Sequence, residues 1–97
     1  MDSRFLNVVV KGDSMWPTLV DGVTVKFEIL GAKTPEVGQI VLTKHPFRKD
    51  TKIIKRIQSI ENDKAFLVGD NPDPTASDDS HNFGMINFSD IIARIIN

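Results

Sequence analysis

The chain has 97 residues, a length that predicts one compact domain (residues 1–97) with a single core. Its 12 lysines and arginines nearly balance 13 aspartates and glutamates, so the charge shows no general signature of a nucleic-acid partner. The absence of cysteine excludes a thiol nucleophile, a disulfide framework and a thiolate metal site. The chain has no apolar run of about 18 residues, and Asp2 and Arg4 interrupt its start, so we expect no transmembrane anchor, no secretory signal and a cytoplasmic location.

Six or seven short strands with turns between them are predicted along the chain. The first apolar run, residues 5–10, is followed by a polar turn, which is typical of a strand. Residues 23–30 alternate apolar and polar side chains, so their odd positions are expected to face the core. Similar patterns predict strands over residues 37–42, 51–60, 65–68 and 91–96. The expected fold class is therefore all-β or mostly β, a single domain of curled antiparallel sheet.

A serine lies in a tight polar turn after the first predicted strand, in the sequence GDSMWP of residues 12–17. Glycine, aspartate, serine and proline are ordinary turn residues, so the segment has a purely structural explanation. The same turn places Ser14 at a strand end, where a nucleophile would meet a substrate. A serine hydroxyl attacks an amide only when a base takes its proton and donors stabilise the oxyanion. Ser14 is thus a candidate nucleophile that needs a partner.

Lys55 is the strongest candidate for that base. It lies between Ile53 and Ile57 on the more apolar face of its predicted strand. A lysine acts as a base only when neutral, and burial lowers its pKa by penalising the ammonium form. The alternative is a lysine whose stem covers apolar surface while its ammonium group reaches water. The two histidines, His45 and His81, lie in polar turns and are expected to be solvated surface residues.

Residues 69–84 form a long segment of glycine, aspartate, asparagine, proline and serine. This composition predicts a solvated loop, yet so long a loop is uncommon in a small domain and is often functional. A calcium-binding loop is disfavoured because Pro72 and Pro74 occupy alternate positions where ligands would be needed. The segment is therefore expected either to contribute to a site or to be disordered.

Four motifs along the chain resemble, in their order, those of type I signal peptidases. They are GDSMWPTL at residues 12–19, GQIV at 38–41, IKRI at 54–57, and GDNPD at 69–73 with the residues that follow to 84. Each motif alone is weakly specific, but the series covers about residues 9 to 92. The short form without an anchor is most similar to the soluble branch that matures nickel-type superoxide dismutases. The fold implied is the signal peptidase and LexA-like protease fold.

This resemblance implies a Ser-Lys dyad in which Ser14 is the nucleophile and Lys55 the general base. The N–H of Ser14 would be one oxyanion donor. Gly12 stands where many of these enzymes carry a serine or threonine hydroxyl as the second donor, so either a backbone N–H or a water replaces it or the enzyme is slower. The residues beside the nucleophile are implied to contact substrate or, as in some relatives, a membrane surface: Met15, Trp16 and Pro17.

The last motif implies residues that support the catalytic lysine. Matching the loop from its C-terminal side makes Ser77 the hydrogen-bond partner of that lysine, and matching from the N-terminal side makes it Thr75. Asp70 is implied to pair with Arg56, and Asp79 to hold the geometry of the site.

The function implied is that of a serine endopeptidase that removes an N-terminal propeptide from the precursor of a nickel superoxide dismutase. The enzyme would need no cofactor and no metal, and would bind its peptide substrate as an extended strand along a sheet edge. No nucleic-acid partner is expected. One alternative is a LexA-like self-cleaving peptidase domain, which is disfavoured because only about a dozen residues precede Ser14. Another is a peptide-binding domain that keeps the fold and has lost turnover.

Overall fold

The computed structural model describes residues 4–95, which form one antiparallel sheet of seven strands. The strands are β1 (Phe5–Val9), β2 (Thr24–Ile29), β3 (Ile40–Lys44), β4 (Lys52–Glu61), β5 (Lys64–Val68), β6 (Ile86–Asn87) and β7 (Ile91–Arg94). The turn η1 (Pro74–Ala76) and the helix α1 (Ser80–Phe83) lie between β5 and β6, and η2 (Phe88–Asp90) precedes β7. The expected mostly β, antiparallel fold is confirmed. No helix within residues 4–95 is long and apolar enough to cross a membrane.

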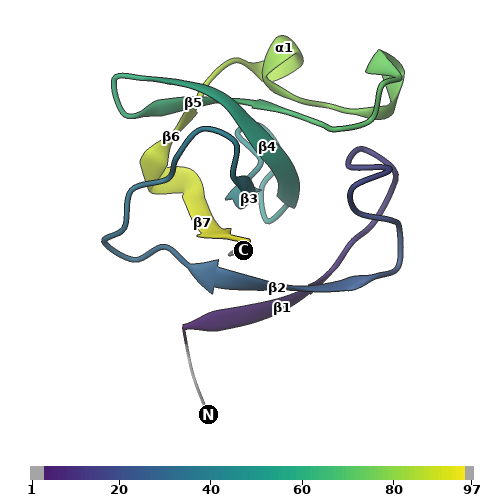
Figure 1. Ribbon diagram of the computed structural model, residues 1–97. Helices are drawn as coiled ribbons and strands as arrows, with labels where there is room; N and C mark the ends of the chain where they lie inside the picture. The colour runs from purple at the N-terminus through teal and green to yellow at the C-terminus, as the bar shows by residue number, and fades with distance from the viewer. Residues whose placement is uncertain (1–3, 96–97) are drawn as a thin grey trace.

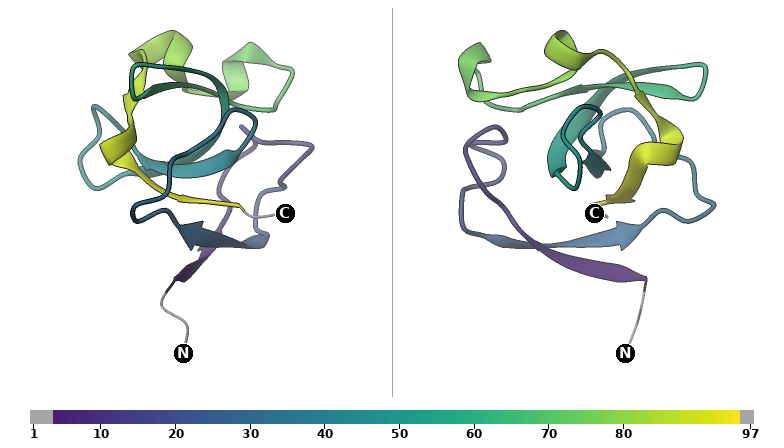
Figure 2. Two further views of the ribbon diagram at one scale, coloured as in Figure 1. Left: turned by 60° about the vertical axis from the view of Figure 1, so that its left-hand side comes forward. Right: turned by 180° about the vertical axis from the view of Figure 1, so that it is seen from behind.

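The sheet curls so that β1 and β2 lie on one side of the molecule and β4 and β5 on the opposite side, with β7 and β3 between them (Figure 1 and Figure 2). Its strand order is β1-β2-β7-β3-β4-β5-β6, so β1 and β6 are the two edges. The last strand, β7, pairs with both β2 and β3 and thereby joins the β1–β2 pair to the rest of the sheet. The loop between β1 and β2 meets the segment after β5 (Figure 1). These two segments carry most of the residues predicted for a site.

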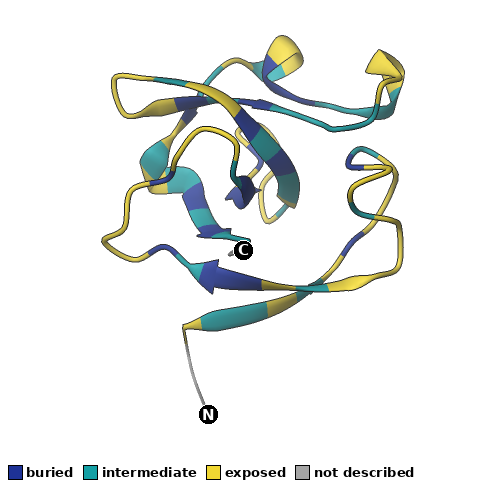
Figure 3. Ribbon diagram, in the orientation of Figure 1, coloured by how far each residue is buried: buried dark blue, intermediate teal, exposed yellow. Residues whose placement is uncertain are grey.

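β3 is the most buried strand, and its first four residues are all buried (Figure 3). Successive side chains of a strand point to opposite faces, so burial of all four requires that both faces be covered. Ile40 and Leu42 pack on one side in a cluster with Phe27. Val41 packs on the other side in a cluster with Ile57. The curled sheet therefore has interior on both sides of β3, and Lys55 of β4, which pairs with Val41 at the centre of β3, is shielded from water.

β4 combines a buried lysine with a change of register. Lys55 pairs with Val41 of β3 and is buried, so the more apolar face predicted for this lysine is an interior face. The pairing with β5 shifts between Ile57 and Ser59, as happens at a β-bulge. Ile57 and Ile60 consequently pack in the same cluster. Strict alternation along residues 51–60 predicted opposite faces for these two side chains, and the bulge corrects that expectation.

Two other strand expectations need correction. The strand predicted over residues 37–42 begins at Ile40, because Gly38 has φ +91° and turns the chain. In β2, Glu28 is buried although it occupies an even position, since its carboxylate pairs with Lys33 at 2.8 Å and Arg94 at 3.2 Å. The strand predicted over residues 91–96 agrees with β7 as far as residue 94, and its residue 96 lies outside the described residues.

Candidate active site

Ser14 lies on the loop between β1 and β2, which is tied together at its base. The carbonyl of Val10, just after β1, accepts a hydrogen bond from the N–H of Gly22 at 2.8 Å. The N–H of Gly12 donates to the Asp21 carboxylate at 2.6 Å. Gly12 has φ +84°, a conformation in which residues with a side chain are strained. The polar turn read from the sequence is therefore a closed loop that presents a half-buried Ser14.

The start of the segment 69–84 clamps the turn that carries Ser14. The N–H of Asn71 donates to the Ser14 carbonyl at 3.0 Å, and the Asn71 side-chain amide donates to the Asp13 carbonyl at 2.8 Å. A Cβ atom at Gly69 would lie 2.5 Å from the Ser14 carbonyl oxygen and 2.6 Å from Ser77 Oγ. Only glycine permits so close an approach of the two segments. The segment expected to contribute to a site thus packs directly on the Ser14 turn.

An ion pair between Arg56 and Asp70 anchors this clamp to β4. Arg56 Nε and Nη2 donate to the two carboxylate oxygens at 2.8 and 2.7 Å, and Nη1 donates to the Gly38 carbonyl at 2.7 Å. The Thr18 hydroxyl donates to the same carboxylate at 2.6 Å, so the Ser14 loop is tied to it as well. The expected pairing of Asp70 with Arg56 is present. Hydrogen bonds from Arg56, aided by Thr18 and opposed by burial, lower the pKa of Asp70 from 3.8.

We expect Asp70→Asn to lower the free energy of unfolding at neutral pH by about 1–2 kcal/mol, between the values for exposed ion pairs and for hydrogen bonds to charged groups. The folded-state pKa of Asp70 lies below the unfolded value of 3.8. The contribution of the Asp70 carboxylate to the free energy of unfolding is therefore present above pH 3.8 and is lost as the pH falls through the folded-state pKa. Urea unfolding of both proteins from neutral to strongly acidic pH measures the difference, with the exposed Asp63→Asn as control. A difference that stays constant into strong acid would contradict the prediction.

Ser14 and Lys55 line one cavity of about 620 Å³ between β1 and β4. Lys55 is 4 % exposed, and within residues 4–95 its ammonium group makes no hydrogen bond or ion pair. Burial lowers the pKa of Lys55 from 10.5, and the negative charges of Asp79 and Asp78 oppose this shift. In the same described range Ser14 Oγ makes no hydrogen bond, so the two groups share the cavity without a direct bond. The lining also includes aliphatic side chains: Leu6, Val8, Val10, Leu42, Ile53, Ile54 and Ile92.

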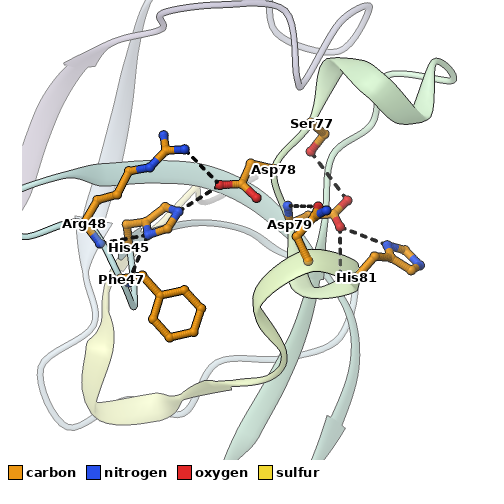
Figure 4. A network of polar contacts seen from close by, with 8 residues as sticks. His45, Phe47, Arg48, Ser77, Asp78, Asp79 and His81 are labelled. Atoms are coloured by element: carbon orange, nitrogen blue, oxygen red, sulfur yellow. Dashed lines mark hydrogen bonds and ion pairs between the residues drawn. The ribbon is translucent and has the colours of Figure 1, made fainter.

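Asp78 is held by a buried histidine (Figure 4). Its Oδ2 accepts a hydrogen bond from His45 Nε2 at 2.9 Å and lies 3.7 Å from Arg48 Nη2. The expectation of a solvated His45 is wrong, because the residue is 8 % exposed. Its ring packs edge-on against Phe83, with ring centroids 5.1 Å apart, and its Nδ1 accepts the backbone N–H groups of Phe47 and Arg48 at 3.1 Å each. The turn after β3 therefore folds over a buried histidine that holds Asp78.

Asp79 caps helix α1 and faces the start of the same segment. Its Oδ1 accepts the N–H of His81 at 2.9 Å and lies 2.9 Å from the His81 ring Nδ1, and the Gly69 N–H also donates to the carboxylate. Burial alone would raise the pKa of Asp79, but these hydrogen bonds outweigh it and lower the pKa. His81 itself is exposed, as expected. Asp79 is thus a stabilised carboxylate, and its negative charge favours the ammonium form of Lys55.

The two residues expected as alternative partners of the lysine lie in different surroundings. Ser77 packs against Gly69, and its hydroxyl is 3.5 Å from Asp79 Oδ2. Thr75 is exposed, and its N–H and hydroxyl both donate to Asp73, at 2.9 and 2.8 Å. Ser77 is therefore the one that lies against the Ser14 turn. Its hydroxyl bonds to Asp79 rather than to the lysine.

The residues after Ser14 do not form one exposed apolar patch. Met15 is 1 % exposed and packs in the cluster around Phe27, so it is not available to an exposed patch that could contact a membrane surface. It nevertheless lines the cavity beside Ser14. Trp16 is 48 % exposed and Pro17 follows it through a cis peptide bond, and among the described residues neither lines this cavity. A contact of Trp16 or Pro17 with substrate stays a prediction.

Three residues that organise the site were not predicted to do so. Thr18 lies inside the first motif, but its bond to Asp70 was not predictable, because the two residues are 52 positions apart in sequence. Asn71 lies inside the last motif, but its bonds to the Ser14 turn depend on how the two loops meet. His45 precedes a proline in a basic turn, which is typical of a solvated histidine, and its partner Asp78 lies 33 positions away.

A family model described as Peptidase S24-like matches residues 2–95. The chain belongs to the Peptidase S24-like family. Membership in this family supports a serine peptidase or LexA-like domain, so the protease family expected from the four motifs is confirmed at that level. No curated protein sequence matches this Peptidase S24-like chain. Within residues 4–95 no group of three or more histidine, aspartate or glutamate side chains is placed to hold a metal ion.

Proposed function

We propose that this Peptidase S24-like domain is a serine endopeptidase in which Ser14 is the nucleophile and Lys55 the general base. One observation carries the proposal: a half-buried serine and a lysine that is 4 % exposed line the same cavity. Burial lowers the pKa of that lysine, which favours the neutral amine that a base requires. The family match supports peptidase chemistry in the same chain. Serine-lysine dyads are a known variant of nucleophile activation.

The reaction follows the two steps of covalent catalysis. Lys55 Nζ accepts the Ser14 hydroxyl proton while Oγ forms a bond to the scissile carbonyl carbon, which gives a tetrahedral oxyanion. The lysine then passes the proton to the leaving amine nitrogen, the C–N bond breaks, and an ester to Ser14 remains. Water attacks this ester as Lys55 accepts one of its protons. The proton returns to Ser14 Oγ when the carboxylic acid product leaves.

The oxyanion donor in this scheme is the N–H of Ser14. Among residues 4–95 this N–H makes no other hydrogen bond, so it is available to an incoming carbonyl. The Gly12 N–H donates to Asp21 at 2.6 Å and is not available in this arrangement. Gly12 also lacks the hydroxyl that would serve as a second donor. Loss of one such donor costs about 3 kcal/mol in other serine peptidases, so we propose a slow enzyme or a water as the second donor.

The substrate would bind as an extended strand beside β1. This strand is an edge of the sheet, and the cavity runs along it from Leu6 to Lys11 and along β4 from Lys52 to Lys55. Backbone groups at a sheet edge can bind a peptide, and pockets then select alternate side chains. The aliphatic lining favours small or apolar side chains next to the scissile bond.

The narrower part of the proposal is the substrate itself, the N-terminal propeptide of a nickel superoxide dismutase precursor, processed in the cytoplasm. Its support is the resemblance of the four motifs to the soluble signal peptidase branch that carries out such maturation. Removal of the propeptide would free the new N-terminus of the product. Nickel belongs to that product and not to the protease.

Intact-mass analysis of a nickel superoxide dismutase precursor incubated with the protein tests this function. We expect the wild type to release the propeptide and Ser14→Ala to release none, because the nucleophile is lost. Ser59→Ala, which changes an exposed serine on β4, serves as control and should cleave like the wild type. Cleavage by Ser14→Ala would refute the assignment of the nucleophile. Cleavage of a pool of unrelated synthetic peptides, with the precursor left intact, would refute only the substrate.

Self-cleavage is a second candidate function, which the family match favours because it supports LexA-like domains as well as peptidases. It predicts fragments of the protein's own chain in the same mass spectra, at a rate that does not depend on protein concentration. Stable binding of the precursor by the wild type without any cleavage would instead favour a peptide-binding domain that has lost turnover.

A further inference from the structure

The proposed mechanism leaves His45 without a role, although this residue holds Asp78, whose charge acts on Lys55. The residue follows β3, and its backbone N–H donates to the Thr51 carbonyl at 2.8 Å, which closes the β3–β4 turn. Its ring is buried between Phe83 and the turn. A buried polar ring is costly unless both nitrogens are hydrogen-bonded, and here both are.

The hydrogen bonds define which nitrogen of His45 carries the proton. Two backbone N–H groups, from Phe47 and Arg48, point at Nδ1, so Nδ1 must be the unprotonated acceptor. The proton therefore sits on Nε2 and is donated to Asp78 Oδ2 at 2.9 Å (Figure 4). The turn thus presents a neutral, directional donor to a carboxylate that is still 42 % exposed.

We propose that His45 is a positioning residue that holds the Asp78 carboxylate and so prevents it from forming an ion pair with Lys55. Within the described residues Lys55 has no ion pair, although Asp78 is near enough for its charge to act on the lysine. A carboxylate that is free to turn toward a buried ammonium group is attracted to it, because little water screens the two charges. A closed Lys55–Asp78 pair would keep the lysine protonated and remove the base. This inference rests on the proposed role of Lys55.

The other charged groups around Lys55 and Asp78 are Asp79, Arg48, Lys11 and Lys52. Asp79 also faces Lys55, but His81 and the Gly69 N–H hold it on the helix side. Arg48 lies 3.7 Å from the same oxygen of Asp78, yet it is largely exposed and its attraction is screened by water. Two further lysines, Lys11 and Lys52, line the cavity, and their positive charge cannot form an ion pair with Lys55. His45 is thus the buried group that decides where Asp78 points.

Titration of Lys55 by NMR, with lysines ¹³C-labelled at Cε, tests the inference without any substrate. The Lys55 signal is the one missing from Lys55→Arg. His45→Asn keeps an acceptor for the Phe47 and Arg48 N–H groups but is too short to reach Asp78, so we expect the Lys55 midpoint to rise by about 1 pH unit or more. His45→Gln, whose longer amide can donate to Asp78, should leave the midpoint close to the wild-type value.

The double variant His45→Asn/Asp78→Asn separates the proposal from general disruption of the turn. If His45 acts through Asp78, this variant should show no rise and should titrate below the wild type. An unchanged or lowered midpoint in His45→Asn, or a rise that persists in the double variant, would overturn the inference. Should His45→Asn fail to fold, Asp78→Asn alone must lower the midpoint, because it removes a charge that favours the ammonium form. A protein that shows these shifts and cleaves nothing would refute the proposed function and leave this inference standing.

Discussion

Lys55→Ala should lower kcat/KM for precursor cleavage about 10²- to 10⁴-fold at neutral pH, the range typical of losing a general base. Wild-type activity should rise with pH as Lys55 loses its proton, with a midpoint below the ordinary 10.5 because burial lowers its pKa. Lys55→Arg should be equally inactive, since a guanidinium group does not deprotonate. Initial rates across the pH range measure these effects. The exposed Lys64→Ala is the control and should keep the wild-type profile.

The same buried lysine should cost stability, which gives an independent check. The pKa of Lys55 is lower in the folded protein than in the unfolded chain, so the unfolded chain binds the proton more tightly. The destabilising effect of Lys55 on the fold therefore decreases as the pH rises. Lys55→Met should therefore be more stable than the wild type at neutral pH, and this advantage should shrink as the pH approaches 10.5. Thermal unfolding at several pH values measures it. A Lys55→Met protein that is less stable than the wild type at neutral pH, and cleaves normally, would refute both assignments.

Gly69→Ala is expected to reduce cleavage by about 10²-fold, the loss that follows a misplacement of about 1 Å in a site. The new Cβ would lie 2.5 Å from the Ser14 carbonyl oxygen and 2.9 Å from Ser77 Cβ, so the Ser14 turn must move away from the segment 69–84. We also expect a loss of about 1–3 kcal/mol in the free energy of unfolding, which is typical of overpacking. Peptide cleavage rates and urea unfolding measure the two effects.

A second substitution shows which contact causes the loss at Gly69. Gly69→Ala/Ser77→Gly removes the contacts with the Ser77 side chain but leaves the one with the Ser14 carbonyl oxygen. We expect this double variant to recover stability in part and to stay slow. Full recovery of cleavage would show that the Ser14 turn does not need the close approach at Gly69, and wild-type activity in Gly69→Ala itself would contradict the prediction outright.

Local patterns were sufficient for the fold class and for most strands. The alternation of residues 23–30 predicted β2 within one residue at each end, because a half-buried strand repeats every two residues. The bulge in β4 and the late start of β3 were not predictable in this way. Both depend on how neighbouring strands pair, and the residue pattern of a single strand does not define its partner or its register.

The sequence by itself determined that Ser14 lies in a tight turn and that Lys55 lies on an apolar strand face, since both follow from residue type and spacing. Only the tertiary structure decided that the two residues line one cavity, that Met15 belongs to the core, and that His45 is buried on Asp78. Such facts depend on contacts between distant segments, as in the bond of His45 to Asp78, 33 positions away, and that of Thr18 to Asp70, 52 positions away. Periodicity reports the environment of one segment, whereas a site is made where several segments pack together.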